Sequence, residues 1–318
     1  MAEGPDMISL TPGNQEQEWI SANWPAATEP PSNSNPVKHQ VWLVFGATGV
    51  IGRQICRMAL SQGDMVMACS RNVKSVVRVP ERWQERLQIQ SCDVRSRQMV
   101  KESVDRTLQR WNRIDVVVAC ASAGVVGACE EQDEHEVRAQ FETNVMGLFH
   151  VVQTTVPFLR LRGNGRYVVL SSLTGMVGTP GLGPFSGTKW AVEGLVESLA
   201  YEVAGQGCRA TLVYPGTFDS DEASRSPPWR HFVIKPMTAD YSGTPAEYGR
   251  RLILWLNPTR PTNVNRIGAI LWELAHCRNP PLRLALGSDA VATMRDKLRH
   301  AVEEVEDWKF LYGTMDED

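Results

Sequence analysis

The chain has 318 residues and a formal net charge of -3, which suits one large domain or two small ones. Its slightly acidic balance argues against a nucleic-acid surface, which would need clustered Lys and Arg. No apolar run is long enough to cross a bilayer, and we find no secretory signal pattern. The seven cysteines form no CxxC pair or Cys/His cluster, so we expect reduced thiols, no metal site and a cytoplasmic location.

Residues 1–38 are rich in Pro, Asn, Ser and Glu and show little hydrophobic periodicity. A segment of this composition buries too little apolar surface to offset the entropy of ordering, so we expect a disordered or loosely attached tail. Trp19, Ile20 and Trp24 could pack loosely on the domain surface or dock a partner. Residues 39–318 are expected to form a single domain.

From residue 41 onward, short apolar runs alternate with segments of helical periodicity. This alternation is typical of a parallel sheet with right-handed crossovers. We therefore predict an α/β domain with a doubly wound sheet of about seven strands and helices on both faces. The predicted strands are 41–45, 65–69, 87–90, 115–120, 166–170, 209–214 and 282–286, and the predicted helices are 51–60, 96–111, 131–161 in two pieces, 185–204, 245–256, 264–277 and 289–308.

The alternation is interrupted after the sixth predicted strand. Residues 217–262 contain several prolines together with Trp229, Phe232, Met237 and Tyr241. Long irregular insertions in compact domains usually serve a function. We therefore expect a lid over an apolar substrate pocket.

A glycine turn joins the first strand to the first helix, with Gly46, Gly49 and Gly52 three residues apart. Glycines allow backbone to approach a pyrophosphate closely, and a helix N-terminus attracts its charge. The flanking strand and helix favour this interpretation over a ligand-free turn and predict a Rossmann-type nucleotide site. Thr48 and Ile51 are expected to contact the cofactor as well.

The second strand ends in Cys69-Ser70-Arg71-Asn72, without a carboxylate. An acidic residue here would bind the ribose hydroxyls of NAD, whereas an Arg accommodates the 2′-phosphate of NADP. NADP(H) is therefore favoured, although Arg71 could simply be a solvated surface residue. Asp93, after the third strand, could hold the adenine edge or could cap the following helix.

Taken in order, these motifs resemble the short-chain dehydrogenase/reductase family, in particular its single-domain members of fungal type. The likeness runs from residue 41 to about residue 286. Further matching features are Asp93-Val94, Ala121-Ser122-Ala123-Gly124, Asn144 within Thr143-Asn144-Val145-Met146-Gly147, Ser171-Ser172 with Gly175, Lys189, and Pro215-Gly216.

The resemblance implies roles for several residues. Ser172 would hold the substrate carbonyl, Asn144 would anchor a water in a proton relay, and Lys189 would bind the cofactor ribose. Lys189 would also lower the pKa of the family's catalytic Tyr. Other residues implied at the cofactor are Ala123, Asn144, Pro215, Gly216 and Thr217.

Three departures from the family pattern stand out. The glycine spacing is that of the extended branch, and Ala121 and Ser122 replace two Asn residues after the fourth strand. Above all, Phe185 stands four residues before Lys189, where the family has its Tyr acid. A phenyl ring carries no exchangeable proton, and loss of a positioned acid costs about 10²–10⁴-fold in rate.

Three consequences are open. Ser172, Tyr214 or Tyr241 could donate the proton instead. The substrate could need no acid, as a cationic iminium or an activated conjugated system does. The site could also use bound cofactor as a scaffold for redox-neutral chemistry.

The leading hypothesis is an NADP(H)-dependent oxidoreductase that acts on a small to medium apolar molecule, such as a specialised metabolite. The alternatives are a redox-neutral isomerase or cyclase and a non-catalytic nucleotide-binding regulator. We expect a small-molecule substrate and neither nucleic acid nor membrane as partners. The resemblance also implies a homodimer or homotetramer in which the helix at 185–204 and the one before it pair across a twofold axis.

Overall fold

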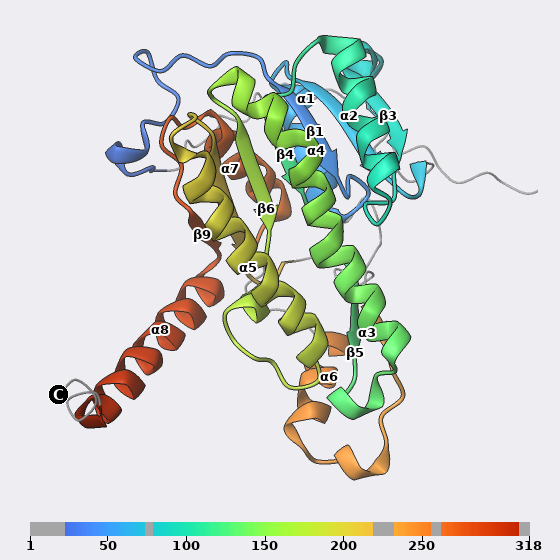
Figure 1. Ribbon diagram of the computed structural model, residues 1–318, viewed down its shortest axis with the longest axis vertical. Helices are drawn as coiled ribbons and strands as arrows, with labels where there is room; N and C mark the ends of the chain where they lie inside the picture. Colours follow the sequence, from blue (N-terminus) through green and yellow to red (C-terminus); the bar gives the residue numbers. More distant parts are fainter. Residues whose placement is uncertain (1–22, 74–78, 219–231, 256–261, 312–318) are drawn as a thin grey trace, which may run out of the picture.

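A parallel seven-stranded sheet forms the centre of the described part of the chain (Figure 1). The computed structural model describes residues 23–73, 79–218, 232–255 and 262–311. The strand order is β3-β2-β1-β4-β6-β7-β9, so the chain reverses direction across the sheet between β1 and β4. The strands are β1 (Val41–Phe45), β2 (Met65–Ser70), β3 (Leu87–Ser91), β4 (Val116–Ala119), β6 (Arg166–Leu170), β7 (Arg209–Pro215) and β9 (Arg283–Leu286). All seven predicted strands and the doubly wound Rossmann-type fold are confirmed.

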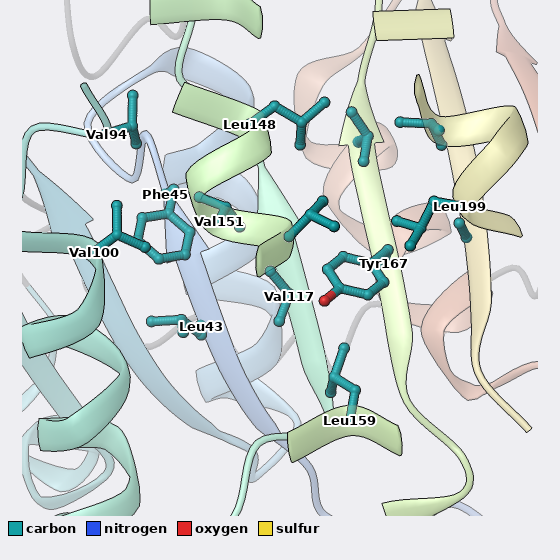
Figure 2. Close-up of a cluster of buried hydrophobic side chains, with 14 of the residues drawn as sticks. Leu43, Phe45, Val94, Val100, Val117, Leu148, Val151, Leu159, Tyr167 and Leu199 are labelled. Carbon is teal, nitrogen blue, oxygen red and sulfur yellow. The ribbon is translucent and has the colours of Figure 1, made fainter. Parts of the chain in front are cut away.

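Helices cover both faces of the sheet because its central strands bury side chains in both directions. In β1, Leu43 and Phe45 belong to one apolar core, whereas Trp42 and Val44 belong to the other. Figure 2 shows the first core, which lies between the sheet and the helices α2, α4 and α5. The helices α1 and α7 cover the opposite face. The long helices are α1 (Val50–Ser61), α2 (Arg97–Trp111), α3 (Glu134–Phe141), α4 (Gly147–Arg162), α5 (Gly183–Ala204), α6 (Pro245–Trp255), α7 (Val264–His276) and α8 (Ser288–Trp308).

Local sequence signals fix several helix boundaries. Ser96 caps α2 by accepting a hydrogen bond from the Met99 N–H, as its position in the sequence predicts. Asp133 caps α3 in the same way. The segment predicted as two helical pieces is α3 and α4 joined by a π-helical turn, Glu142–Met146. Short 3-10 turns occupy Ala26–Thr28, Glu81–Arg86, Cys129–Glu131, Leu173–Gly175, Ala239–Tyr241 and Lys309–Leu311.

The predicted lid contains an element that periodicity did not indicate. Strand β8 (Phe232–Ile234) pairs in parallel with β5 (Gly124–Val126) to form a separate two-stranded sheet. Each strand has three residues, too few to show an alternating pattern. Trp229, which we also expected in the lid, lies outside the described residues.

The N-terminal segment corrects one expectation. From Asn23 onward it is held against α7 and not loosely attached, because Trp24 donates its indole N–H to Glu273 at 2.6 Å. Thr28 is buried, and the Arg278 N–H donates to the carbonyl of Glu29 at 3.1 Å. Trp19 and Ile20 lie outside the described residues.

Helix α8 extends away from the body of the molecule (Figure 1). Among the described residues, no helix is long and apolar enough to span a membrane. The same residues contain no group of His, Cys, Asp or Glu side chains arranged to hold a metal ion.

Candidate active site

The predicted site residues gather at the carboxyl ends of β1, β4, β6 and β7. Parallel sheets bind ligands at this edge, next to the point where the strand order reverses. A cavity lies here, between the sheet and the helices α4 and α5. Its lining includes Ala121, Asn144, Leu148, Lys189 and Val192.

Backbone packing requires two of the three glycines in the turn after β1. Gly46 has φ of +90°, and a Cβ on it would lie 2.5 Å from the Ala121 nitrogen. A Cβ on Gly52 would lie 2.4 Å from the Gly46 carbonyl oxygen. At Gly49, by contrast, a Cβ would meet no described atom nearer than that same oxygen, at 3.3 Å. That contact is also tight, although it constrains Gly49 less than the contacts at Gly46 and Gly52 constrain those residues.

The N-terminus of α1 fits a phosphate. Its N-cap is Gly49, so no side chain caps the first N–H groups, and no acidic residue stands in the first turn. Those N–H groups and the helix dipole favour an anion. Thr48 lies beside the turn and exchanges a 2.8 Å hydrogen bond with Ser70, at the end of β2, while Ile51 is almost fully buried.

A second cation joins Arg71 near the ends of β2 and β3. Arg95 donates to both carboxylate oxygens of Asp93, the shortest contact being 2.6 Å. This hydrogen bonding is the main reason that the pKa of Asp93 lies below its ordinary value, and the charge of Arg71 acts in the same direction. Arg95 thus holds this carboxylate while the charge of Arg71 acts on it, and the sequence analysis did not single out Arg95. Its position, two residues after Asp93, is the sequence feature that could have identified it as a second cation at this end of the site.

Asn144, in the π-helical turn, fastens two segments of the site together. Its amide donates to the Ala123 carbonyl at 2.8 Å and to the Thr188 hydroxyl at 2.9 Å. Its side-chain oxygen accepts from the Ala123 N–H at 2.8 Å and from the Ser122 hydroxyl at 3.3 Å. Both amide hydrogens are thereby used within the protein, so the side chain positions the loop after β4 against α5.

Lys189 is buried on α5 and donates to the Leu170 carbonyl, at the end of β6, at 3.0 Å. Burial lowers the pKa of Lys189 to about 8, whereas the negative charge of Glu193 opposes that shift. The ammonium also lies 5.6 Å from the centre of the Phe185 ring. A buried cation whose pKa lies near neutrality can change charge in the working pH range.

Phe185 lies under the lid strand. Its ring packs edge-to-face on Phe232, with centroids 4.8 Å apart, and forms a small apolar cluster with Val126 and Leu182. A Cβ on Gly124 would lie 2.2 Å from the Phe232 ring and 2.9 Å from Phe185. A glycine at that position is therefore what lets the two rings meet.

The two serines after β6 have different environments. Ser172 is half-buried and accepts a hydrogen bond from the Thr174 N–H at 3.3 Å. Ser171 is buried and donates to Glu193, which also accepts a hydrogen bond from Tyr214. Burial raises the pKa of Glu193 despite these donors and the Arg283 guanidinium 3.9 Å away.

Two of the proposed alternative acids are already engaged. Tyr214 is fully buried and its hydroxyl is held by Glu193, so it does not face a substrate. Burial raises the pKa of Tyr214 well above its ordinary value. Tyr241 hydrogen-bonds Glu130, which raises the pKa of that phenol.

Asp289, at the start of α8, holds the loop after β7. Its carboxylate accepts from the Thr217 N–H at 2.7 Å and from the Thr217 hydroxyl at 2.9 Å. A Cβ on Gly216 would lie 2.1 Å from the same carboxylate. Pro215 ends β7 immediately before this loop. Neither Asp289 nor Glu193 was singled out from the sequence, because the hydrogen-bond partners of each carboxylate lie more than 20 positions away along the chain.

The assembled residues can hold a dinucleotide at the glycine turn and present a buried cation and a half-buried hydroxyl beside it. Residues 40–231 match the family described as short chain dehydrogenase. The chain belongs to that family. A curated relative, "Oxidoreductase BOA17" from Botryotinia fuckeliana, is 30% identical over 253 residues, which cover 79% of this chain and 90% of the relative.

Solved structures of short-chain dehydrogenases share the fold. One from Streptomyces avermitilis superposes with a TM-score of 0.81 at 30% identity, over 88% of this chain and all of that one. Two more distant structures, each 19% identical, show the fold alone. One from Burkholderia phymatum is in complex with NAD (TM-score 0.70; 85% and 95% covered), and one from Burkholderia cenocepacia is in complex with NADP (0.61; 88% and 99%).

Proposed function

We propose that this short-chain oxidoreductase is NADP(H)-dependent and moves a hydride to or from a small to medium apolar molecule, such as a specialised metabolite. The observation that carries the proposal is Lys189, buried on the Leu170 carbonyl beside a cavity and a phosphate-compatible glycine turn. Ala123, Pro215, Gly216 and Thr217 would line the cofactor with that turn. The free thiols of all seven cysteines, which lie within the described residues, support a reducing compartment.

The preference for NADP(H) rests on charge, since the fold itself serves both cofactors. Arg95 pairs with Asp93, and the charge of Arg71 also acts on that carboxylate, so two guanidinium groups lie within reach of this end of the site. A 2′-phosphate would attract both guanidinium groups. Asp93 would then orient the arginines as well as contact the adenine.

The proposed chemistry follows from Phe185, which occupies the position of the family's Tyr acid. Bound NADPH would supply the hydride. Lys189 would bind the ribose through its ammonium, and the Ser172 hydroxyl would donate to a substrate oxygen. Since Phe185 has no proton to give, we propose an electrophile that needs none there, such as an iminium or a conjugated system activated elsewhere.

The apolar environment supports that choice of substrate. Phe185, Val126 and Leu182 are buried together, and Phe232 and Ile234 pack on them from the lid. Burying a polar group in such surroundings is costly without a hydrogen-bond partner. An apolar substrate would therefore be favoured next to this cluster.

A second candidate is a redox-neutral isomerase or cyclase that uses bound cofactor as a scaffold. The observation in its favour is that Tyr214 and Tyr241 are committed to Glu193 and Glu130. Neither is then positioned as an acid in place of the missing Tyr. Substrate conversion without oxidation of NADPH, measured at 340 nm beside product analysis, would favour this candidate over the first.

The cofactor proposal is tested by titrating NADPH and NADH into the purified protein and following fluorescence. We expect tighter binding of NADPH, and we expect Arg71→Ala and Arg95→Ala each to weaken NADPH by about tenfold with little effect on NADH. Arg110→Ala, at the far end of α2, is the matched control. Equal affinity for the two cofactors would refute the preference.

We also propose a homo-oligomer built through α4 and α5. Their outward faces carry the exposed aromatic side chains Phe149, Trp190 and Tyr201. Exposed apolar patches of this kind commonly mark interfaces between subunits. Analytical ultracentrifugation of a Trp190→Glu variant tests this interface.

A further inference from the structure

Beyond Met294, which packs against the central core, the apolar side chains of helix α8 lack a partner. Within α8, all of which the structure describes, only Ala290 is buried. Leu298 is 54% exposed, Val302 62% and Val305 55%, and the helix extends into solvent beyond the sheet (Figure 1). Exposed apolar surface of this extent on one helix indicates that another molecule covers it.

The spacing of these side chains indicates that the partner covering them is another α-helix. Apolar residues recur at alternating intervals of three and four along the whole helix, which is the a/d pattern of a coiled coil. The 21 residues of α8 make three heptads, the lower end of the length at which such a pattern is informative. The seam consists of Val291, Met294, Leu298, Ala301, Val305 and Trp308, of which Met294 also packs against the central core.

The charges beside the seam select the partner and its direction. Lys297 and Glu304 occupy the same heptad position, one repeat apart, immediately next to the seam. Among the described residues neither makes an ion pair, whereas Arg299, on the outer face, pairs with Asp296 and Glu303. In coiled coils, charges at the edge of the seam set partner choice and orientation.

A second copy of α8 in antiparallel orientation would cover the apolar seam and would also pair the charged side chains beside it. Placing Leu298 opposite Ala301 of the second copy brings Val291 opposite its Trp308. Lys297 then lies next to Glu304 of the second copy, and the twofold axis repeats the pair. In a parallel arrangement Glu304 would face Lys309 of the second copy, but Lys297 would face Val302, so only the antiparallel arrangement gives both charges a partner.

We propose that two copies of this chain associate through an antiparallel coiled coil of their α8 helices. This surface is distinct from the outer faces of α4 and α5. A membrane surface suits α8 poorly, because the helix has six acidic and three basic side chains and anionic lipid favours basic helices.

The first test measures mass by sedimentation velocity on the full chain. Leu298→Asp places a charge at the centre of the seam and should halve the mass of the assembly at micromolar concentration. Circular dichroism checks that α8 remains helical. An unchanged mass with a folded helix would overturn the proposal, whatever other interface the protein uses.

The second test reverses the charges. Lys297→Glu and Glu304→Lys should each weaken association by about tenfold, because each creates two like-charge pairs across the axis. The double variant should restore it, since the reversed charges meet again. Glu303→Lys, the same change on the outer face, is the control and should have little effect.

If the double variant Lys297→Glu/Glu304→Lys does not regain self-association, the antiparallel register is refuted. Sedimentation with vesicles that contain phosphatidylserine tests the alternative that a membrane surface covers the apolar face of α8. Binding of a monomeric protein to those vesicles, lost in Leu298→Asp, would overturn the proposal in favour of a lipid surface. Absence of vesicle binding together with self-association supports it.

Discussion

At the scale of single residues, Phe185 decides what chemistry the site can perform. Its side chain is 3% exposed and lies between the Phe232 ring and the Lys189 ammonium. A cation near a ring face gains modestly from the ring quadrupole, so the phenyl group is compatible with a charged Lys189. A hydroxyl added to this ring would bring an acid within the influence of that cation.

Phe185→Tyr should therefore raise the reduction of simple ketones on the order of 10²-fold, the low end for a positioned acid. Native turnover should stay the same or fall, because the new hydroxyl enters an apolar cluster and could cost about 1–3 kcal/mol of stability if unpaired. NADPH oxidation with both substrate types and thermal melts measure these effects.

Phe232→Tyr is the control, since it adds the same hydroxyl to the neighbouring ring. A Phe185→Tyr protein that folds, binds NADPH and reduces no ketone would show that Ser172 and Lys189 do not form a working site.

Lys189 and Glu193 occupy successive turns of α5 and influence each other's charge. Burial lowers the pKa of Lys189 to about 8, and the carboxylate of Glu193 is the main influence that raises it again. The thiol of Cys120 also lies within its electrostatic environment. Lys189 is thus mostly protonated below pH 8 and mostly neutral above it.

NADPH affinity should consequently fall as pH rises through about 8, because neutral Lys189 loses its attraction for the cofactor. Glu193→Gln should move this break to lower pH, since removal of the negative charge favours neutral Lys189. Fluorescence titrations between pH 6 and 10 measure the break. Glu197→Gln, one turn further along α5, should leave it in place.

A pH profile that is the same in wild type and in Lys189→Met would exclude Lys189 as its source. A break that rises in Glu193→Gln would contradict the assigned sign of the interaction.

At the scale of elements, the small sheet of β5 and β8 attaches the segment predicted as a lid to the body. β5 follows β4 directly, and pairing with it places Phe232 over Phe185. The Lys235 ammonium adds a 2.7 Å ion pair to Glu136 on α3. The position of β8 thus depends on the close packing of the Phe232 ring against Gly124.

Gly124→Ala should displace Phe232, because its Cβ would lie 2.2 Å from that ring. We expect a loss of about 1–3 kcal/mol in stability, typical of overpacking. We also expect faster proteolysis within residues 232–255 as the lid strand detaches. Gly178→Ala is the matched control, since no described atom lies within 4 Å of its added Cβ. Equal melting and proteolysis in the two variants would contradict this account of the lid.

At the scale of the whole molecule, the N-terminal segment joins distant parts of the chain. Trp24 bonds Glu273 on α7, and Asn35 donates to the His276 carbonyl at 3.1 Å. Glu29 pairs with Arg278 at 2.7 Å. These contacts pack the N-terminal segment against the C-terminal end of α7.

Trp24→Ala should lower the free energy of unfolding by about 1–2 kcal/mol, because it removes half-buried apolar surface and leaves Glu273 without its indole donor. Denaturant unfolding measures the change. Val37→Ala, at an exposed position of the same segment, should have almost no effect. An unchanged free energy of unfolding in Trp24→Ala would support the expectation that this segment is only loosely attached.

Local sequence signals predicted the strands of the central sheet, the main helices and the glycine turn after β1. Apolar runs identify strands buried on both faces, and Ser96 marks a helix start, because these signals lie within a few residues. Gly46 and Gly52 were identifiable for the same reason. The backbone between one strand and the next helix makes the contacts that require them.

Tertiary structure alone decided what surrounds the chemistry. Phe232 meets Phe185 across 47 positions of sequence, and Tyr214 meets Glu193 across 21. Contacts of this kind depend on which strands become neighbours, and they leave no periodic pattern along the chain. The sequence therefore predicted that Phe185 stands where the resemblance implies an acid, but only the fold showed that the Tyr214 hydroxyl is engaged by Glu193.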